Sequence, residues 1–171
     1  MEPGNGPVTD SLDRLRDLAT GLGGSVGNGE MLAWADQGDD RVLADQVFGV
    51  IRDAGLLGDV DPRVPVNIPA DADALMSRMW EIDEAEAIGL LVNLAVSTRA
   101  DRPRQHFLRR RNQDDPQDVF GEMASLIGPG ARWWTNTDLT QWNQVTQHMF
   151  DAVVVGAGNG VIVTVVTFEG G

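Results

Sequence analysis

The chain has 171 residues, 42% of them hydrophobic, and a formal net charge of −13 at pH 7, which suits one compact domain with a substantial core. It contains no Cys and no Tyr, and all 13 of its positively charged residues are Arg. These absences exclude disulfides, thiolate metal sites, cysteine nucleophiles, the lysines of phosphate-binding loops and Schiff bases, and a phenolic acid or base.

The negative charge restricts the partners of the chain. Phosphate groups would be repelled, so neither nucleic acid nor an anionic membrane surface is expected as a partner. The charge favours a basic partner, or it serves only solubility. Residues 99–111 differ from the rest, with six Arg and one Asp between two acidic segments. They either pair with acidic helices of the same chain, form a solvated loop, or bind a phosphate-bearing ligand.

The N-terminus predicts no structured element. Residues 1–8 are rich in Pro and Gly and lack apolar periodicity, so we expect them to be disordered, and residues 9–171 to form a single domain. Neither the basic nor the apolar region of a signal peptide is present. No apolar run reaches the roughly 20 residues that a membrane span needs. A cytoplasmic protein is therefore expected.

The first half of the chain has the 3.6-residue periodicity of amphipathic helices. A cap at Thr9 or Asp10 begins the first one, and Gly23-Gly24 end it. Residues 30–37 predict a short second helix after a glycine-rich linker. A third helix is expected over residues 39–54, because its apolar residues return on one face and Gly55 follows.

Three further helices are predicted downstream. Asp71 caps one that contains Leu75 and Trp80. Residues 85–96 fit either a buried helix or a central strand, and the capping residues before them favour the helix. Asp115-Pro116 places an N-cap before a proline at the first helical position, which predicts a helix that ends at Gly128.

The C-terminal third changes to a period near two and predicts strands over residues 131–137 and 161–168, with either one long strand or a turn and a strand over residues 145–155. Asn159-Gly160 predicts a type I′ hairpin turn between the last two, since both of its positions need positive φ. A turn one residue earlier would shift every cross-strand pair, and two apolar faces leave that register open.

The segment before this turn, Val-Val-Val-Gly-Ala-Gly, also looks like the start of a dinucleotide-binding turn. That interpretation fails, because Val161 occupies the third glycine position of the motif. The β-branched residues that follow favour a strand, and only eleven residues remain after Gly160. Helices first and strands last indicate an α+β fold, with N-terminal helices packed on a C-terminal antiparallel sheet of three or four strands that ends in a β-hairpin.

No catalytic, cofactor-binding or metal-binding residue is predicted. The two histidines, His106 and His148, have no partner at ligand spacing, and no serine lies in a Gly-x-Ser-x-Gly motif. Most paired carboxylates lie at expected helix starts, where capping accounts for them. The alternative is a small α+β enzyme or ligand-binding domain that uses carboxylates with His148 or an Arg in a cleft.

Tryptophans after residue 130 suggest an interaction surface. Two adjacent strand residues point to opposite faces of a sheet, so either Trp133 and Trp134 both lie in the core or at least one faces solvent. Exposed tryptophans are typical anchors of protein interfaces. The predicted partner-binding residues are Trp133, Trp134, Asp138, Trp142, Asp39 and Asp40.

The run Trp133-Trp134-Thr135-Asn136-Thr137-Asp138-Leu139-Thr140-Gln141-Trp142-Asn143, which continues into the predicted hairpin, resembles actinobacterial immunity proteins that neutralise secreted toxins. The resemblance implies a cognate toxin as partner. We therefore expect a non-catalytic, acidic immunity or antitoxin-type protein that covers a basic partner protein.

Overall fold

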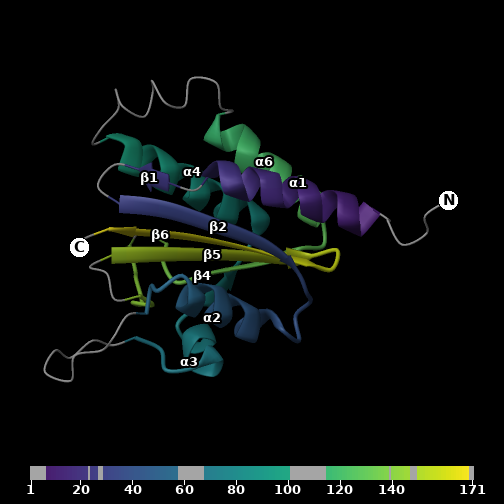
Figure 1. Cartoon of the computed structure of the whole chain (residues 1–171). Helices are drawn as coiled ribbons and strands as arrows, with labels where there is room; N and C mark the ends of the chain where they lie inside the picture. The colour runs from purple at the N-terminus through teal and green to yellow at the C-terminus, as the bar shows by residue number, and fades with distance from the viewer. Residues whose placement is uncertain are drawn as a thin grey trace, which may run out of the picture.

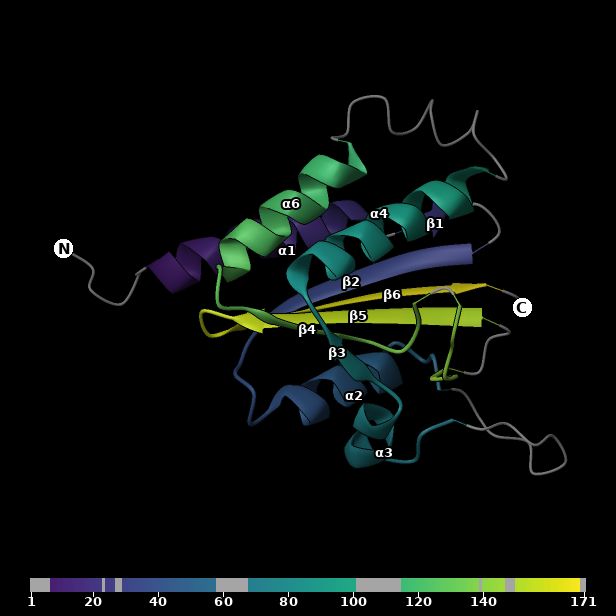
Figure 2. The same ribbon diagram turned by 180° about the vertical axis from the view of Figure 1, so that it is seen from behind.

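The computed structural model describes residues 7–22, 24–26, 29–57, 68–100, 115–138, 140–146 and 150–169. A six-stranded antiparallel sheet lies between two layers of helices (Figures 1 and 2). Its strands lie side by side in the order β1-β2-β6-β5-β4-β3. Their bounds are β1 Gly24–Val26, β2 Gly29–Gln37, β3 Trp80–Ile82, β4 Arg132–Thr135, β5 Phe150–Gly158 and β6 Val161–Glu169. The predicted α+β class is confirmed.

Helices cover both faces of the sheet. Three lie on one face: α1 (Pro7–Leu22), α4 (Glu84–Ala100) and α6 (Pro116–Ile127). Two lie on the other: α2 (Leu43–Asp53) and α3 (Ala72–Ser77). Each layer encloses its own hydrophobic cluster, one around Leu15, Phe120 and Trp133 and the other around Val47, Ile51 and Leu75. Burial on both faces explains why the central strands are apolar almost without interruption.

The β5–β6 hairpin is the centre of the sheet, and its prediction is confirmed. Gly158 pairs with Val161, which leaves Asn159-Gly160 as a two-residue turn. Asn159 has φ 54° and Gly160 φ 76°, the positive values that a type I′ turn requires. Residues 151–157 and 161–168 are buried throughout. The register left open by the pattern is thereby settled, and the strand after Gly160 excludes a dinucleotide-binding helix there.

The helix expected over residues 30–37 is wrong, because these residues belong to strand β2. Met, Leu and Ala favour helices locally, yet β2 pairs with β6 along its whole length. Its side chains alternate between the two clusters, with Met31 and Ala35 in one and Leu32 and Trp34 against the other. Without β2, the apolar strand β6 would be an unpaired edge.

Trp80 was also assigned to a helix, and this assignment is wrong. Helix α3 ends at Ser77, and Trp80–Ile82 form the edge strand β3, which pairs with residues 133–135 of β4. The sheet has six strands instead of three or four, and three of them lie in the half of the chain expected to be helical.

The helix starts predicted at Asp115 and before residue 85 are confirmed, whereas the cap predicted at Thr9 or Asp10 is wrong, because α1 already begins at Pro7. Asp115 accepts a hydrogen bond from the Gln117 N–H, with Pro116 as the first helical residue of α6. Asp83 likewise accepts from the Glu86 N–H at the start of α4, which resolves residues 85–96 as helix. The expected disorder of residues 1–8 falls mostly outside the described residues, although α1 already includes Pro7 and Val8. Residues 101–111 of the Arg-rich segment also lie outside them.

Candidate partner-binding site

The six predicted contact residues do not gather in one place. Asp39, Asp40 and Trp134 lie toward the turn end of the β5–β6 hairpin, where the Gly38 N–H donates to Gly160 O at 2.9 Å. Asp138 and Trp142 lie on the segment that follows β4. The six residues therefore lie on two separate surfaces, except for one that lies in the core.

Trp133 is the core position, and its predicted role as a contact residue is wrong. Its side chain is 2% exposed and lies in the cluster beneath α1, α4 and α6. The ring crosses Gly156 so closely that a Cβ on this glycine would lie 2.6 Å from Trp133 Cζ3. Trp134 packs against the opposite cluster, as strand alternation predicted. A partner has no access to Trp133 in the folded chain.

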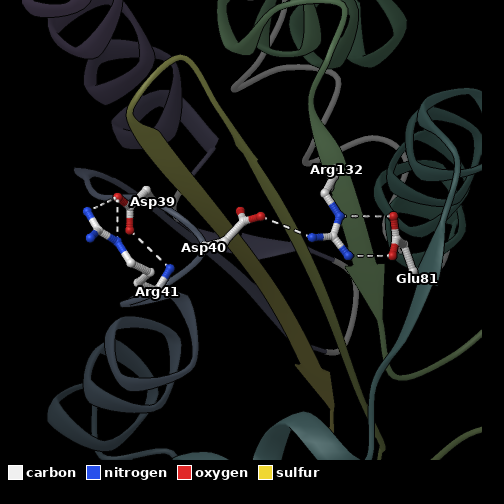
Figure 3. A network of polar contacts seen from close by, with 5 residues as sticks. All are labelled: Asp39, Asp40, Arg41, Glu81 and Arg132. Atoms are coloured by element: carbon white, nitrogen blue, oxygen red, sulfur yellow. Dashed lines mark hydrogen bonds and ion pairs between the residues drawn. The ribbon is translucent and has the colours of Figure 1, made fainter.

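The first surface is the Arg132 cluster, formed by Asp39, Asp40, Arg41, Glu81 and Arg132 (Figure 3). The Arg132 guanidinium donates to Glu81 through Nε at 3.2 Å and Nη2 at 2.8 Å. Its Nη1 donates to Asp40 Oδ2 at 3.0 Å. Figure 3 shows Asp40 reaching toward Arg132 across the hairpin ribbon. Arg132 thus links β3, β4 and the loop that follows β2.

Arg132 and Arg41 also contact the aromatic ring and the carboxylates of this cluster. The Arg132 guanidinium lies over the Trp134 ring, 5.0 Å from its centroid, within the range of a cation–π interaction. Hydrogen bonds from Arg132 lower the pKa of Glu81, and hydrogen bonds from Arg41 lower the pKa of Asp39. Both carboxylates are therefore ionised at neutral pH and already paired with cations of the same chain.

The second surface is the 136–146 loop, in which Leu139 lies outside the described residues. Thr137 and Trp142 form an antiparallel bridge, and the Asp138 N–H donates to Gln141 O at 3.2 Å. Asp138 Oδ1 accepts from the Thr140 hydroxyl at 2.6 Å and from the backbone N–H groups of Thr140 and Gln141. These bonds, that of the hydroxyl first, lower the pKa of Asp138. These hydrogen bonds hold the turn together, and the exposed Asp138 carboxylate is ionised at neutral pH.

A buried carboxylate attaches this loop to the sheet. Asp151, at the start of β5, is 0% exposed. It accepts from the Trp142 indole Nε1 at 3.0 Å and from the Asn136 amide at 2.7 Å. The backbone N–H groups of Val145 and Thr146 and the Thr146 hydroxyl also donate to it. Such donors offset the large cost of burying a charge. Asp151 therefore fixes both the loop and the Trp142 indole.

Asn136 completes the attachment. Its Oδ1 accepts from the Val153 N–H at 2.7 Å, and its amide also donates to Asn143 O at 2.9 Å. The Asn136 side chain thereby bonds to β5 at the position next to the last backbone pair of the two strands, Thr135 with Val154. Neither Asp151 nor Asn136 was predicted as a site residue. The available signal was the position of Asp151 in an otherwise apolar strand, because a buried carboxylate requires several donors.

The remaining sequence candidates add no further site. His106, His148 and residues 101–111 of the Arg-rich segment lie outside the described residues. Among those that are described, no group of three or more His, Asp or Glu side chains is placed to hold a metal ion. Within the same segments, no helix is long and apolar enough to cross a membrane.

No family model matches the chain, and no curated protein matches it significantly. Among solved structures, the fold is similar to a crystal structure of citrus MAF1, with 8% sequence identity and a TM-score of 0.48. The similarity covers 92% of this chain and 97% of that chain. At this level it carries no argument about function or site residues.

Proposed function

We propose that this chain is a non-catalytic, acidic binding protein that covers a basic protein partner, in the manner of an immunity protein or antitoxin that inhibits its cognate toxin. The observation that carries the proposal is the placement of the negative charge. Of the acidic side chains that the structure describes, all except Asp36, Glu122 and Asp151 are exposed. The net charge of −13 therefore acts on the surroundings of the protein.

Two aspartates on α1 support this interpretation. Asp13 and Asp17 lie on the exposed side of the helix, beyond its first turn. In the described part of the chain neither forms an ion pair or caps a helix. Like charges four residues apart destabilise a helix slightly. These two aspartates therefore lower the stability of α1 slightly and form no compensating contact among the described residues. A field that attracts a basic partner gives them a use, because such fields accelerate association.

Lasting affinity requires an anchor in addition to charge. The exposed large hydrophobic side chains of the described residues are Val42, at 43%, and Trp142, at 38%. Tryptophan is enriched among residues that dominate binding energy, whereas valine is under-represented. We therefore place Trp142 and Asp138 first among the predicted contact residues. Asp39, Asp40 and Trp134 come second, because arginines of the same chain already bind them.

The inhibitory role and the toxin as partner rest on the sequence resemblance of residues 133–143 and the hairpin. The cytoplasmic location belongs to the same proposal.

The proposal can be tested by capture from a lysate of the native host, with the tagged protein as bait. We expect one basic protein in near-stoichiometric amount, with a yield that falls as salt rises from about 0.05 to 0.5 M, because exposed charges are screened. The Asp13→Asn/Asp17→Asn double variant should capture less at low salt. Thr20→Ser, an exposed change on the same helix without loss of charge, is the matched control.

A different result of the same experiment would contradict the proposed function. If no basic protein is retained above an unrelated acidic bait, and a small metabolite raises the melting temperature, the proposal is wrong. The enzyme or ligand-binding alternative would then replace it.

A further inference from the structure

We infer that the outer edge of β2, along residues 32–37, binds an extended basic segment of a partner protein as an additional strand of the sheet. The inference rests on the proposed function and adds the way in which the backbone of the partner is held.

The first argument is that this edge of the sheet is open. β2 has nine residues, whereas β1, its neighbour on the outer side, has three. β1 pairs with residues 29–31, and no described strand pairs with residues 32–37 on that side. Figure 1 shows α1 above β2 and α2 below it, on the two faces of the sheet. An open edge presents unpaired backbone N–H and C=O groups, to which another extended segment can bind.

The second argument is the direction of the backbone groups. The two-residue turn of the β5–β6 hairpin is closed by a hydrogen-bonded pair, Gly158 with Val161. Bonded and non-bonded pairs alternate along antiparallel strands, so the even-numbered residues of β6 bond to even-numbered residues of β2. The odd-numbered residues of β2 therefore turn their N–H and C=O groups outward. Arg16 Nε agrees with this direction, because it donates to Ala35 O at 3.0 Å. The N–H and C=O groups of Ala33 likewise face outward.

The third argument is that a single described side chain bonds to this edge, and that it holds the edge weakly. Arg16 on α1 reaches Ala35 O through Nε and Asp36 Oδ1 through Nη2 at 3.3 Å. The side chains of Arg16 and Asp36 are 52% and 42% exposed, and ion pairs of such exposure contribute little to stability. A charged side chain at an edge prevents unspecific pairing. A matching strand can displace Arg16 at small cost.

Apolar side chains next to the edge are only partly covered. Leu32, Ala33 and Trp34 are half-buried, whereas residues 161–168 of the neighbouring β6 are all buried. Leu32 and Trp34 pack against the cluster on the α2 side, and Ala33 packs against the cluster beneath α1. An added strand would cover these side chains further, and the apolar surface removed from water would contribute to binding.

The charge beside the edge selects a basic occupant. Asp13 lies three residues before Arg16 and therefore on the same side of α1. Asp13 forms no ion pair in the described part of the chain, and displacement of Arg16 leaves Asp36 without its cation. Arg or Lys residues of an extended segment would pair with both carboxylates. A second copy of this chain does not suit the edge, because it would bring the same two aspartates and a further net charge of −13.

The experiment measures backbone amide hydrogen exchange in the full ¹⁵N-labelled chain, with and without a synthetic peptide that alternates Arg and Val. At low salt and a peptide concentration about ten times its Kd, exchange at Ala33 and Ala35 should slow about tenfold, because the free fraction falls by that factor. The same peptide with every backbone amide N-methylated keeps its charge but cannot donate to a strand. It should leave the exchange of both residues unchanged.

Two pairs of variants test the edge from the side of the protein. Ala33→Pro removes an outward N–H and leaves the bonds between β2 and β6 in place, since proline is tolerated where a strand N–H faces solvent. It should weaken peptide binding about tenfold, whereas Ala33→Ser, which keeps the N–H, should change it less than about twofold. Arg16→Ala frees Ala35 O and should strengthen binding about threefold. Arg14→Ala removes the same charge from α1, where Arg14 pairs with Glu122, and should have less than about half of that effect.

Several results would overturn the inference. One is protection of another segment by the peptide while exchange at Ala33 and Ala35 stays unchanged. Another is equal protection by the N-methylated peptide, which also decides the question if Ala33→Pro fails to fold. The inference fails separately from the proposed function. A lysate partner that folded Ala33→Pro retains as well as wild type refutes this site alone, whereas protection of Ala33 and Ala35 by the peptide without any lysate partner refutes the proposed function alone.

Discussion

The Arg132 cluster and the 136–146 loop use similar residues in opposite ways. Both combine a tryptophan with exposed aspartate or glutamate. In the Arg132 cluster, the carboxylates of Asp40 and Glu81 point to a guanidinium of the same chain, which also lies over Trp134. In the loop, the polar edge of Trp142 points inward to Asp151, while Asp138 lies exposed at the turn. Residue type alone therefore does not distinguish a cross-link within the chain from an exposed loop.

The difference has a simple physical origin. Arg132 lies two residues from Trp134 on β4, on the same face of the sheet, and Glu81 pairs directly with Trp134 on the neighbouring strand. Cation, ring and carboxylate thus meet by strand register. The loop lacks such a register and is organised by a buried carboxylate that collects N–H and O–H donors. The predictions below test these two arrangements against each other.

The largest effect is expected for Asp151→Ala. It leaves the Trp142 indole, the Asn136 amide and two backbone N–H groups without their acceptor. Each buried unsatisfied donor costs about 1–3 kcal/mol, and partial access of water reduces the sum, so we expect a loss of about 4 kcal/mol in unfolding free energy. Urea unfolding measures it. Asp138→Asn, an exposed change in the same loop, is the control, and an equal effect of the two variants would contradict the anchoring role of Asp151.

The next largest effect concerns the buried tryptophan. Gly156→Ala places a Cβ within 2.7 Å of three Trp133 ring atoms, and such overpacking costs about 1–3 kcal/mol. Gly89→Ala is the matched control, because no atom lies within 4 Å of its added Cβ and alanine favours a helix by about 1 kcal/mol. Urea unfolding should show the two variants shifted in opposite directions. If Gly156→Ala left the free energy of unfolding unchanged, the Trp133 ring would be able to move away from the added Cβ.

These sites also show what the sequence can and cannot predict. Strand alternation placed Trp133 and Trp134 on opposite faces, and the Asn159-Gly160 turn was identified because few dipeptides adopt two positive φ values. Both are local rules. β2 and β3 were missed because they depend on distant partners, β6 and β4, which override helix propensity in short segments.

The same limit applies to the candidate site. Trp142 and Asp138 were predicted as contact residues because they closely follow the Trp133-Trp134 pair in the sequence. The role of Asp151 required knowing that donors from residues 136–146 converge on one carboxylate. The pairing of Asp40 with Arg132 joins residues 92 positions apart, and no sequence pattern specifies it.

The third prediction concerns removal of the arginine at the centre of the Arg132 cluster. Arg132→Ala removes the guanidinium from Trp134, Glu81 and Asp40. These groups then offer a tryptophan and two carboxylates to an added cation. We expect the Trp134 indole N–H signal of the ¹⁵N-labelled chain to shift with a nona-arginine peptide in this variant but not in wild type, and total binding to rise about twofold. Arg52→Ala, which also removes an exposed arginine from an ion pair and an aromatic ring, should leave the Trp134 signal unchanged.

The smallest effect concerns the protonation of Asp138. The Thr140 hydroxyl is the main cause of its lowered pKa, so Thr140→Val should raise that pKa toward the ordinary value of 3.8. Because the folded pKa lies below the unfolded one, the stability that these bonds contribute is present above about pH 4 and is lost as pH falls through the folded pKa. Carboxyl ¹³C titration measures the shift. Thr20→Val, which removes a hydroxyl bonded to a helix carbonyl instead, should leave the Asp138 titration unchanged. If both variants titrate like wild type, the turn does not hold Asp138 in its ionised state, and Asp138 would resemble any solvated surface acid.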